Sequence, residues 1–194
     1  MDIMGDHMMA FSDKNSEEEL EIEFRDTFNK VNKKSEFMDL VKIREYKSSD
    51  CKILGNLFYD TVHSVNTKDY SEEEVDAWAS KNKDFSKWDS VFNLNYTLIA
   101  YIDNKIIGFG DIDKSGYLNM LYIHKDYQGK GIATLICNKL EKGHNEITTD
   151  ASITAKRFFE KRGYKVIKEQ YVKRNSVLLK NYIMKKQIEP NINL

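Results

Sequence analysis

The sequence is poor in the features that mark several classes of protein. Its 194 residues include only one proline and two cysteines, and 30 basic and 31 acidic side chains leave a formal net charge of -1. A balance this even gives no global field that would attract nucleic acid or an anionic membrane. No run approaches the ~20 apolar residues of a membrane-spanning helix, and the N-terminus lacks the order of a secretory signal. We therefore expect a cytoplasmic protein that binds neither nucleic acid nor membrane.

The cysteines and histidines are too scattered to predict a metal site. Neither Cys51 nor Cys137 has a second Cys or His at ligand spacing. Both lie in apolar patterns typical of helices, where a free thiol behaves as a small hydrophobic group. We expect two buried thiols, no disulfide and no metal.

The N-terminal part of the chain differs in character from the rest. Residues 1–15 show no periodicity and predict a flexible tail, whereas 16–32 combine a capping box with an apolar stripe and predict an amphipathic helix. The stripe can pack on the main domain, or it can form a partner contact such as a homodimer interface. We expect an N-terminal extension over 1–40, a main domain over 41–187 and a C-terminal tail over 188–194.

Strand and helix patterns alternate through the main domain. Periodicity and turn residues predict strands at 41–46, 96–102, 105–112, 117–123, 146–150, 165–172 and 177–186. Capping residues and apolar stripes predict helices at about 50–65, 71–79, 84–92, 130–142 and 153–162. Hairpins in the middle and crossover helices later indicate an α+β fold with a mixed, mostly antiparallel central sheet of about seven strands flanked by helices.

The segment Tyr127–Ala133 carries the strongest chemical signal. It reads Tyr-Gln-Gly-Lys-Gly-Ile-Ala between a hydrophobic strand and an amphipathic helix. The first turn of a helix presents backbone N–H groups at the positive end of the dipole, which favours phosphate. Gly129 and Gly131 permit close approach, and Lys130 adds a cation. The alternative is plain turn chemistry, and the dinucleotide fingerprint fails because residue 134 is Thr.

Two motifs resemble those of the GNAT superfamily of N-acetyltransferases. Gln128, Gly131 and Ala133 match motif A of that family, Q/R-x-x-G-x-G/A. Residues 155–164 read Ala-Lys-Arg-Phe-Phe-Glu-Lys-Arg-Gly-Tyr and resemble the family's A-x-x-F-Y-x-x-x-G-F motif. The order and separation of the motifs also resemble the family, and the resemblance covers about residues 41–186.

Further likeness narrows the resemblance and implies an activity. The stretches 63–78 and 151–155 resemble the bacterial YafP-type branch. The resemblance implies transfer of acetyl from acetyl-CoA to a primary amine by direct attack, with the arm of the cosubstrate between two parallel strands that separate at the sheet centre. It places the following residues at acetyl-CoA: Leu121, Tyr122, Ile123, Gln128, Gly129, Lys130, Gly131, Ile132, Ala133, Ser152, Phe158 and Phe159.

The chain departs from the family at the general acid. Many members carry Tyr where this sequence has Phe159, which has no proton to give. Tyr164 is then a candidate acid, Tyr171 and Tyr182 are alternatives, and water can also protonate the thiolate. A frequent Asn after the fifth strand is absent, and Ser152 stands nearest to its place.

Four residues are candidates for the general base. Asp111 lies in an apolar strand, where burial would raise its pKa, and Asp150 ends the strand beside the expected gap. His63 and Glu74 are further candidates, and a water relay is the alternative to any single side chain. Each has a structural reading too: Asp111 as a surface carboxylate, Asp150 as a helix cap, His63 as an ordinary packed histidine.

The acceptor amine is the least determined part of the prediction. Tyr59, His63, Tyr70 and Trp78 are candidates for an aromatic acceptor pocket, with core packing as the alternative. Two other functions stay open beside the acetyltransferase. One is a non-catalytic acyl-CoA-binding or sensing module, favoured by Phe159, and the other is a regulatory partner protein.

Overall fold

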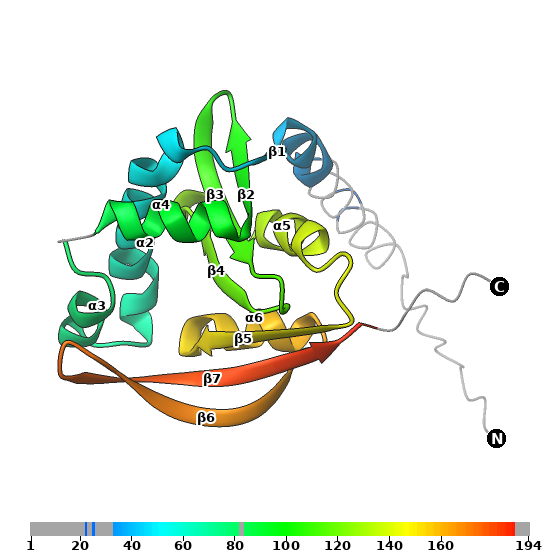
Figure 1. Cartoon of the computed structure of the whole chain (residues 1–194). Helices are drawn as coiled ribbons and strands as arrows, with labels where there is room; N and C mark the ends of the chain where they lie inside the picture. The colour runs from blue at the N-terminus through cyan, green and yellow to red at the C-terminus, as the bar shows by residue number, and fades with distance from the viewer. Residues whose placement is uncertain (1–21, 23–24, 26–32, 82–83, 189–194) are drawn as a thin grey trace, which may run out of the picture. The chain divides into compact units, whose positions relative to one another are not determined.

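The computed structural model describes Ile22, Arg25 and residues 33–81 and 84–188 (Figure 1). The chain divides into two compact units, 1–39 and 40–194. In the first unit, the described residues are helical. Most of the amphipathic helix predicted at 16–32 lies outside the described residues, so that prediction stays untested.

Seven strands of the described chain form two antiparallel sheets (Figure 1). The first sheet has the order β1-β2-β3-β4 and the second β5-β7-β6. The strands are β1 (Lys42–Glu45), β2 (Tyr96–Ile102), β3 (Lys105–Ile112), β4 (Leu118–Ile123), β5 (Glu146–Ser152), β6 (Lys165–Arg174) and β7 (Val177–Gln187). The predicted α+β class and strand number are confirmed, and the sheets separate between β4 and β5.

Helices cover both faces of the first sheet. The helices α2 (Cys51–Val65) and α4 (Phe85–Leu94) pack on one face and α5 (Ile132–Leu140) on the other. The helix α3 (Glu72–Trp78) contacts α2 and β7, and α6 (Ile153–Lys161) packs on the second sheet. Short 3-10 turns lie at η1 (Ser48–Asp50), η2 (Asn66–Lys68) and η3 (Lys125–Tyr127). Strand β3 shows the two faces, because successive residues point to opposite sides. A Cβ at Gly110 would lie 3.1 Å from Ile136 of α5, whereas Phe109 packs edge-on against Phe92 of α4.

The main hydrophobic core lies between the first sheet and helices α2 to α4. Its buried members include Leu54, Phe58 and Val62 from α2 together with Phe92 and Phe109. Burial of these large apolar side chains is the main driving force that fixes the helices on this face. The described helices include none that is long and apolar enough to cross a membrane.

Local signals before two helices had different outcomes. Ser71 and Glu74 form a capping box before α3, the helix expected at 71–79. Before α2, the helix expected at about 50–65, the Asp50 side chain makes no capping hydrogen bond, and η1 precedes the helix. The Asp50 carboxylate accepts two hydrogen bonds from Arg44, at 2.6 and 2.9 Å, because a bidentate ion pair is a stronger partner than a helix end.

Candidate functional site

Strands β4 and β5 run parallel but join at one end only. Tyr117 and Thr148 form an isolated parallel bridge, and the Thr148 N–H donates to the Gly116 carbonyl at 3.0 Å. Gly116 has φ +87°, and a Cβ there would lie 2.4 Å from the Glu146 carbonyl oxygen, so only glycine fits. Beyond this bridge, no further ladder pair joins the two strands in the described chain. A gap therefore opens toward their C-terminal ends.

A buried ion cluster clamps the joined end of the gap. Glu141 follows α5, is 7% exposed, and accepts hydrogen bonds from Arg162 Nε (3.1 Å), Tyr164 Oη (3.0 Å) and Lys186 Nζ (2.7 Å). These partners come from the end of α6, the residue before β6, and β7. The cluster thus ties the helix that covers the first sheet to the second sheet.

The N-terminus of α5 lies at the open end of the gap. Gly131 is its N-cap residue with φ +95°, and no described side chain caps the helix. Gln128, Gly129 and Lys130 are exposed, and no described atom lies within 4 Å of a Cβ built on Gly129. Because the first helical N–H groups have no partner within their own helix, this exposed end suits an anion. The Gln128 amide instead donates to the Ile123 carbonyl at 3.2 Å and braces the loop.

The N-terminus of α6 is closed by side chains. Ser152 Oγ accepts a hydrogen bond from the Ala155 N–H at 3.1 Å, which is a standard N-cap. Tyr70 Oη accepts from the Ile153 N–H at 2.9 Å and donates to the Lys180 carbonyl at 2.6 Å. Ser152 is thus the cap that the sequence interpretation weighed for Asp150.

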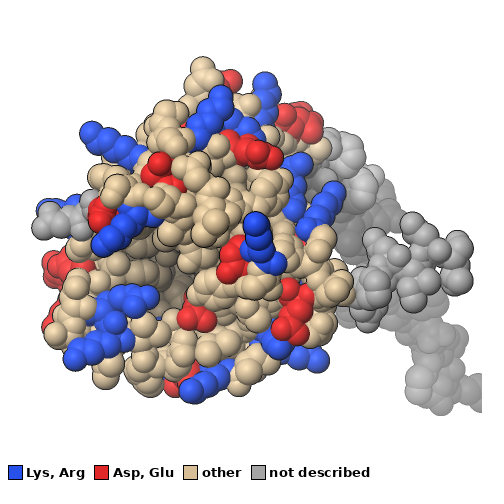
Figure 2. Space-filling model, viewed as in Figure 1, with Lys and Arg blue, Asp and Glu red and all other residues tan. Residues whose placement is uncertain are grey.

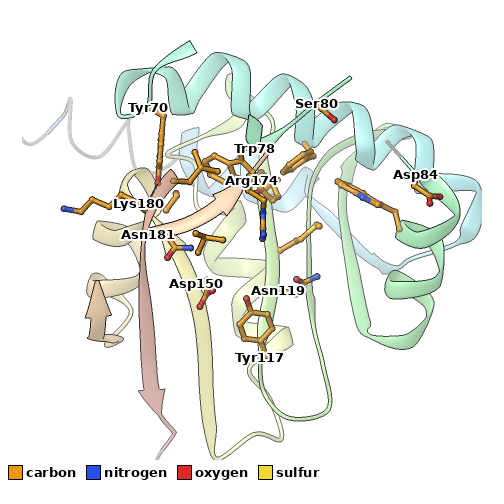
Figure 3. Close-up of a pocket in the computed structure, with 17 residues that line it drawn as sticks. Tyr70, Trp78, Ser80, Asp84, Tyr117, Asn119, Asp150, Arg174, Lys180 and Asn181 are labelled. Atoms are coloured by element: carbon orange, nitrogen blue, oxygen red, sulfur yellow. Dashed lines mark hydrogen bonds between the residues drawn. The ribbon is translucent and has the colours of Figure 1, made fainter. Parts of the chain in front are cut away.

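A cavity of about 370 Å³ lies beside the gap, between α2 to α4 and the β6–β7 hairpin (Figure 3). Aromatic side chains make much of its wall, and polar groups from β4 to β7 make the rest. Its lining residues include Phe58, Tyr70, Trp78, Asp84, Trp88, Tyr117, Asn119, Tyr122, Asp150, Ser152, Arg174, Lys180 and Asn181. The volume suits a small molecule.

Two carboxylates line this cavity, and their surroundings shift their pKa values in opposite directions. Asp84 caps α4, and its hydrogen bonds from Ser86 and Lys87 hold the pKa of its carboxyl below the ordinary value. Burial raises the pKa of Asp150, although the Gln170 amide donates to it at 3.2 Å. Because burial shifts the pKa of Asp150 upward, Asp150 is the better candidate of the two for a proton acceptor.

Tyr117 adds a hydroxyl that the sequence reading did not consider for catalysis. Figure 3 shows its phenol pointing into the cavity toward the side of Asp150. Burial, followed by the charge of Asp150, raises the pKa of Tyr117 to about 12, so the phenol keeps its proton. Its hydroxyl makes no hydrogen bond within the described part of the chain. The only signal in the sequence was a Tyr after Gly116 at a strand start.

Asp111, the other candidate base, lies behind the cavity wall. It is fully buried, and its Oδ2 accepts hydrogen bonds from Asn95 (2.7 Å) and Asn119 (3.0 Å). Its Oδ1 has no partner in the described chain, and burial raises its pKa. Asn119 lines the cavity whereas Asp111 does not, so any influence of Asp111 on a ligand passes through that amide.

The remaining predicted site residues are divided between the cavity and other places. Tyr70 and Trp78 line it, whereas Tyr59, His63 and again Tyr70 line a second, more open hollow between α2 and α3. In that hollow His63 contacts Asp76 at 3.0 Å. The structure does not bring Tyr164 to the cavity, because its hydroxyl belongs to the Glu141 cluster.

Of the aromatic pair of the second motif, Phe159 is buried and Phe158 is half-buried. Phe159 is 3% exposed and packs edge-on against Phe158 and Tyr164 at ring distances of 5.2 and 5.0 Å. The position that carries Tyr in many GNAT proteins is therefore core in this chain, and a phenol there would need a buried partner.

Figure 2 shows Lys and Arg interspersed with Asp and Glu over one face of the molecule. Among the described residues, no group of three or more His, Cys, Asp or Glu side chains is placed to hold a metal ion.

The chain belongs to the GNAT acetyltransferases, because the family model of the acetyltransferase (GNAT) domain matches residues 66–186. It is 32% identical over 149 residues to the "uncharacterized N-acetyltransferase YafP" of Escherichia coli (strain K12), which covers 76% of this chain and 97% of that protein. This similarity confirms the YafP-type resemblance of the motifs and the predicted enzyme class, N-acetyltransferase.

Solved structures show the same fold. A GCN5-related N-acetyltransferase from Rhodopseudomonas palustris is 33% identical with a TM-score of 0.73, and the match covers 76% of this chain and 95% of that one. The PaiA N-acetyltransferase from Thermoplasma acidophilum, solved in complex with coenzyme A, is 22% identical with a TM-score of 0.63 and coverage of 76% and 99%.

Proposed function

We propose that the protein transfers the acetyl group of acetyl-CoA to a primary amine that enters the 370 Å³ cavity. The observation that carries this proposal is the gap between β4 and β5, which opens beside the uncapped N-terminus of α5. Family membership supports the reaction, and the coenzyme A in the Thermoplasma acidophilum relative supports the cosubstrate.

The residues on the open side of the gap would hold the cosubstrate through their backbone. Residues 128–133 would surround the diphosphate with N–H groups and Lys130. The edge of β4 that faces the gap, at Leu121, Tyr122 and Ile123, would pair with the pantetheine arm, and an N–H on this edge would polarise the acetyl carbonyl. The Ile123 carbonyl would not take part, because it already accepts hydrogen bonds from Gln128 and Thr61. Ser152 can still donate its hydroxyl proton to the arm while it caps α6.

Asp150 and Tyr117 are the proposed acid–base pair. Asp150 would take a proton from the acceptor ammonium, so that the nitrogen lone pair can attack the thioester carbonyl carbon. The carbon–sulfur bond then breaks, the amide nitrogen releases its second proton to water, and the thiolate takes a proton from Tyr117 or from water. Asp150 returns its own proton to solvent before the next turnover. The phenol would recover its proton from solvent, which reaches the cavity. Tyr117 thereby replaces the phenol that Phe159 lacks.

Steady-state release of free CoA thiol with a panel of primary amines tests the proposal. We expect release that depends on the amine and on its concentration. Tight binding of acetyl-CoA without turnover on any amine would instead identify an acyl-CoA-binding or sensing module.

Three further predictions accompany this function. The match that begins at residue 66 and the strand that begins at Lys42 support an acetyltransferase domain over 41–187, with an extension over 1–40.

Because acetyl-CoA is a metabolite of the cell interior, we expect the protein in the cytoplasm. A homodimer or partner contact through 16–32 would be removed by deleting residues 1–40, and an unchanged oligomeric state together with unchanged partner binding would exclude it.

A further inference from the structure

The cavity contains an arginine that no other part of the described chain neutralises. Arg174 ends β6, lines the cavity, and makes no hydrogen bond or ion pair within 4 Å among the described residues. Figure 3 shows its side chain pointing into the cavity, on the side of Asp150, Asn181 and Tyr117. Lys180 differs, because its ammonium points away and pairs with Glu169 at 2.9 Å. Arg174 is therefore the cation available to a ligand.

The backbone of Arg174 is held in place by a tight hairpin. Asn175 and Ser176, which join β6 to β7, both have positive φ, at 45° and 71°. Such two-residue turns fix the register of a hairpin, and Arg174 pairs with Val177 across it. The Asn175 amide also donates to the Ala77 carbonyl of α3 at 3.4 Å, which links the turn to the opposite wall.

Arg174 and Asp150 lie in one cavity without pairing. The charge of Asp150 raises the pKa of Tyr117, and the charge of Arg174 lowers it. Arg174 also lowers the pKa of Asp150, whereas burial raises it. Yet no ion pair within 4 Å joins them among the described residues. A cation and an anion held apart on one wall are complementary to a ligand that carries both charges, since each then has an opposite partner.

Unpaired polar atoms and aromatic rings complete the wall. Asn181 Oδ1 is buried without a hydrogen-bond partner in the described chain, and it lines the same cavity. A buried acceptor without a partner costs free energy unless a ligand N–H reaches it. On the other side, Phe58 and Trp88 pack edge-on at 5.1 Å and Trp78 packs on Tyr70 at 5.3 Å. These rings suit an apolar or aromatic group.

We propose that the acceptor is an amino acid with a large apolar or aromatic side chain, and that Arg174 recognises its carboxylate. Asp150 faces the amino group and Trp78, Trp88 and Phe58 face the side chain. This assignment rests on the proposed function. Arginine fits a carboxylate with two parallel hydrogen bonds, which makes it a specificity device rather than a diffuse charge.

The test compares amino acids with amines that lack only the carboxylate. The pairs are phenylalanine and phenethylamine, tyrosine and tyramine, tryptophan and tryptamine, and leucine and isopentylamine. For wild type we expect kcat/KM at least roughly tenfold higher for the amino acid of the best pair, the effect of a charged hydrogen bond. Arg174→Gln should abolish this preference by lowering kcat/KM for the amino acid alone, and Arg174→Lys should restore part of it.

A neighbouring lysine provides the matched control. Lys173 is exposed, as Arg174 is, and lies on the same strand, but it does not line the cavity, so Lys173→Gln should leave the preference unchanged. Equal loss for both members of a pair in Arg174→Gln, a wild-type preference for the amines, or turnover of none of the amino acids would overturn the proposal. Weaker acetyl-CoA binding by Arg174→Gln would also overturn it, because Arg174 would then serve the cosubstrate. Thiol release with other amines would leave the acetyltransferase function standing in each case.

Discussion

Helices α5 and α6 each follow a strand of the gap, and each has nine residues. Helix α6 begins directly after β5, whereas a loop containing η3 separates β4 from α5. Their N-termini nevertheless differ. At α6, Ser152 and Tyr70 already bond the first N–H groups, whereas at α5 the chain supplies Gly129, Lys130 and Gly131. The two helices have the same length and similar dipoles. The first N–H groups of α6 are already hydrogen-bonded within the protein, whereas those of α5 suit an external anion.

This contrast assigns different functions to the two sides of the gap. The α5 side offers backbone groups and a positive helix end, which suit the diphosphate of the cosubstrate. The α6 side carries side-chain chemistry, because Asp150 lies two residues before the α6 cap and faces the cavity. Substitutions on the α6 side should thus change catalysis or stability and leave acetyl-CoA affinity unchanged.

The largest expected effect on that side comes from Asp150→Asn. Removing the base should lower kcat by roughly 10²- to 10⁴-fold with acetyl-CoA affinity unchanged. Burial raises the pKa of Asp150 in the folded enzyme. The active carboxylate therefore forms only as the pH rises through this raised pKa, which lies above the ordinary ~3.9. At pH values below the raised pKa, the kcat of the wild-type enzyme should decrease. Measuring kcat against pH should show this acid limb in wild type and its absence in the variant.

Asp84→Asn is the matched control for the base. It changes the second carboxylate of the same cavity, and Asn caps a helix about as well as Asp. Its kcat and its acid limb should stay within about twofold of wild type. A similar collapse in both variants would mean that the charge of the cavity, rather than a base at Asp150, supports the reaction.

The next largest effect is expected from opening the α6 end with Tyr70→Phe. The phenol bonds both the Ile153 N–H and the Lys180 carbonyl, and Tyr70 is 5% exposed. Leaving these buried groups unpaired should cost about 1–3 kcal/mol of the free energy of unfolding, measured by urea denaturation. Tyr171→Phe, at an exposed position, should change stability little. Equal stability of both variants would show that the α6 end is not held by Tyr70.

The smallest effect is expected from Ser152→Ala, which tests the difference between the N-termini of α5 and α6 most specifically. Loss of this cap should lower the free energy of unfolding by about 1 kcal/mol, and Ser152→Asn should restore it. Acetyl-CoA affinity, measured by calorimetry, should change by less than about threefold. A larger loss of affinity in Ser152→Ala would assign Ser152 mainly to the pantetheine arm and weaken the distinction between the two helix ends.

Local patterns in the sequence predicted most elements of the fold. Alternation gave β2 and β3 with the observed bounds, and the Asp103-Asn104 turn between them has the positive φ values of a tight hairpin. The phosphate-type loop before α5 was also visible, since glycines and a helix start are contiguous in the chain. Such features depend on neighbours in sequence and are therefore readable without the structure.

The acceptor side could not be read in the same way. Strands β5 and β6 extend two residues beyond their predicted ends, and these extensions carry Ser152 and Arg174. Tyr70 closes a helix end 83 residues away. Tyr117 enters the cavity only because the sheets separate just after it. The positions of these side chains depend on long-range packing, which local sequence patterns do not predict.

The most direct measurement is acetyl-CoA affinity, by calorimetry, of Gly129→Glu against Gly143→Glu. Both glycines have positive φ, at 73° and 85°, with no described atom within 4 Å of an added Cβ, and they lie beyond opposite ends of α5. Their backbone strain should therefore be similar. A carboxylate at residue 129 should weaken binding by at least roughly tenfold, whereas one at 143 should not. Equal affinity of both variants would contradict a diphosphate site at the N-terminus of α5.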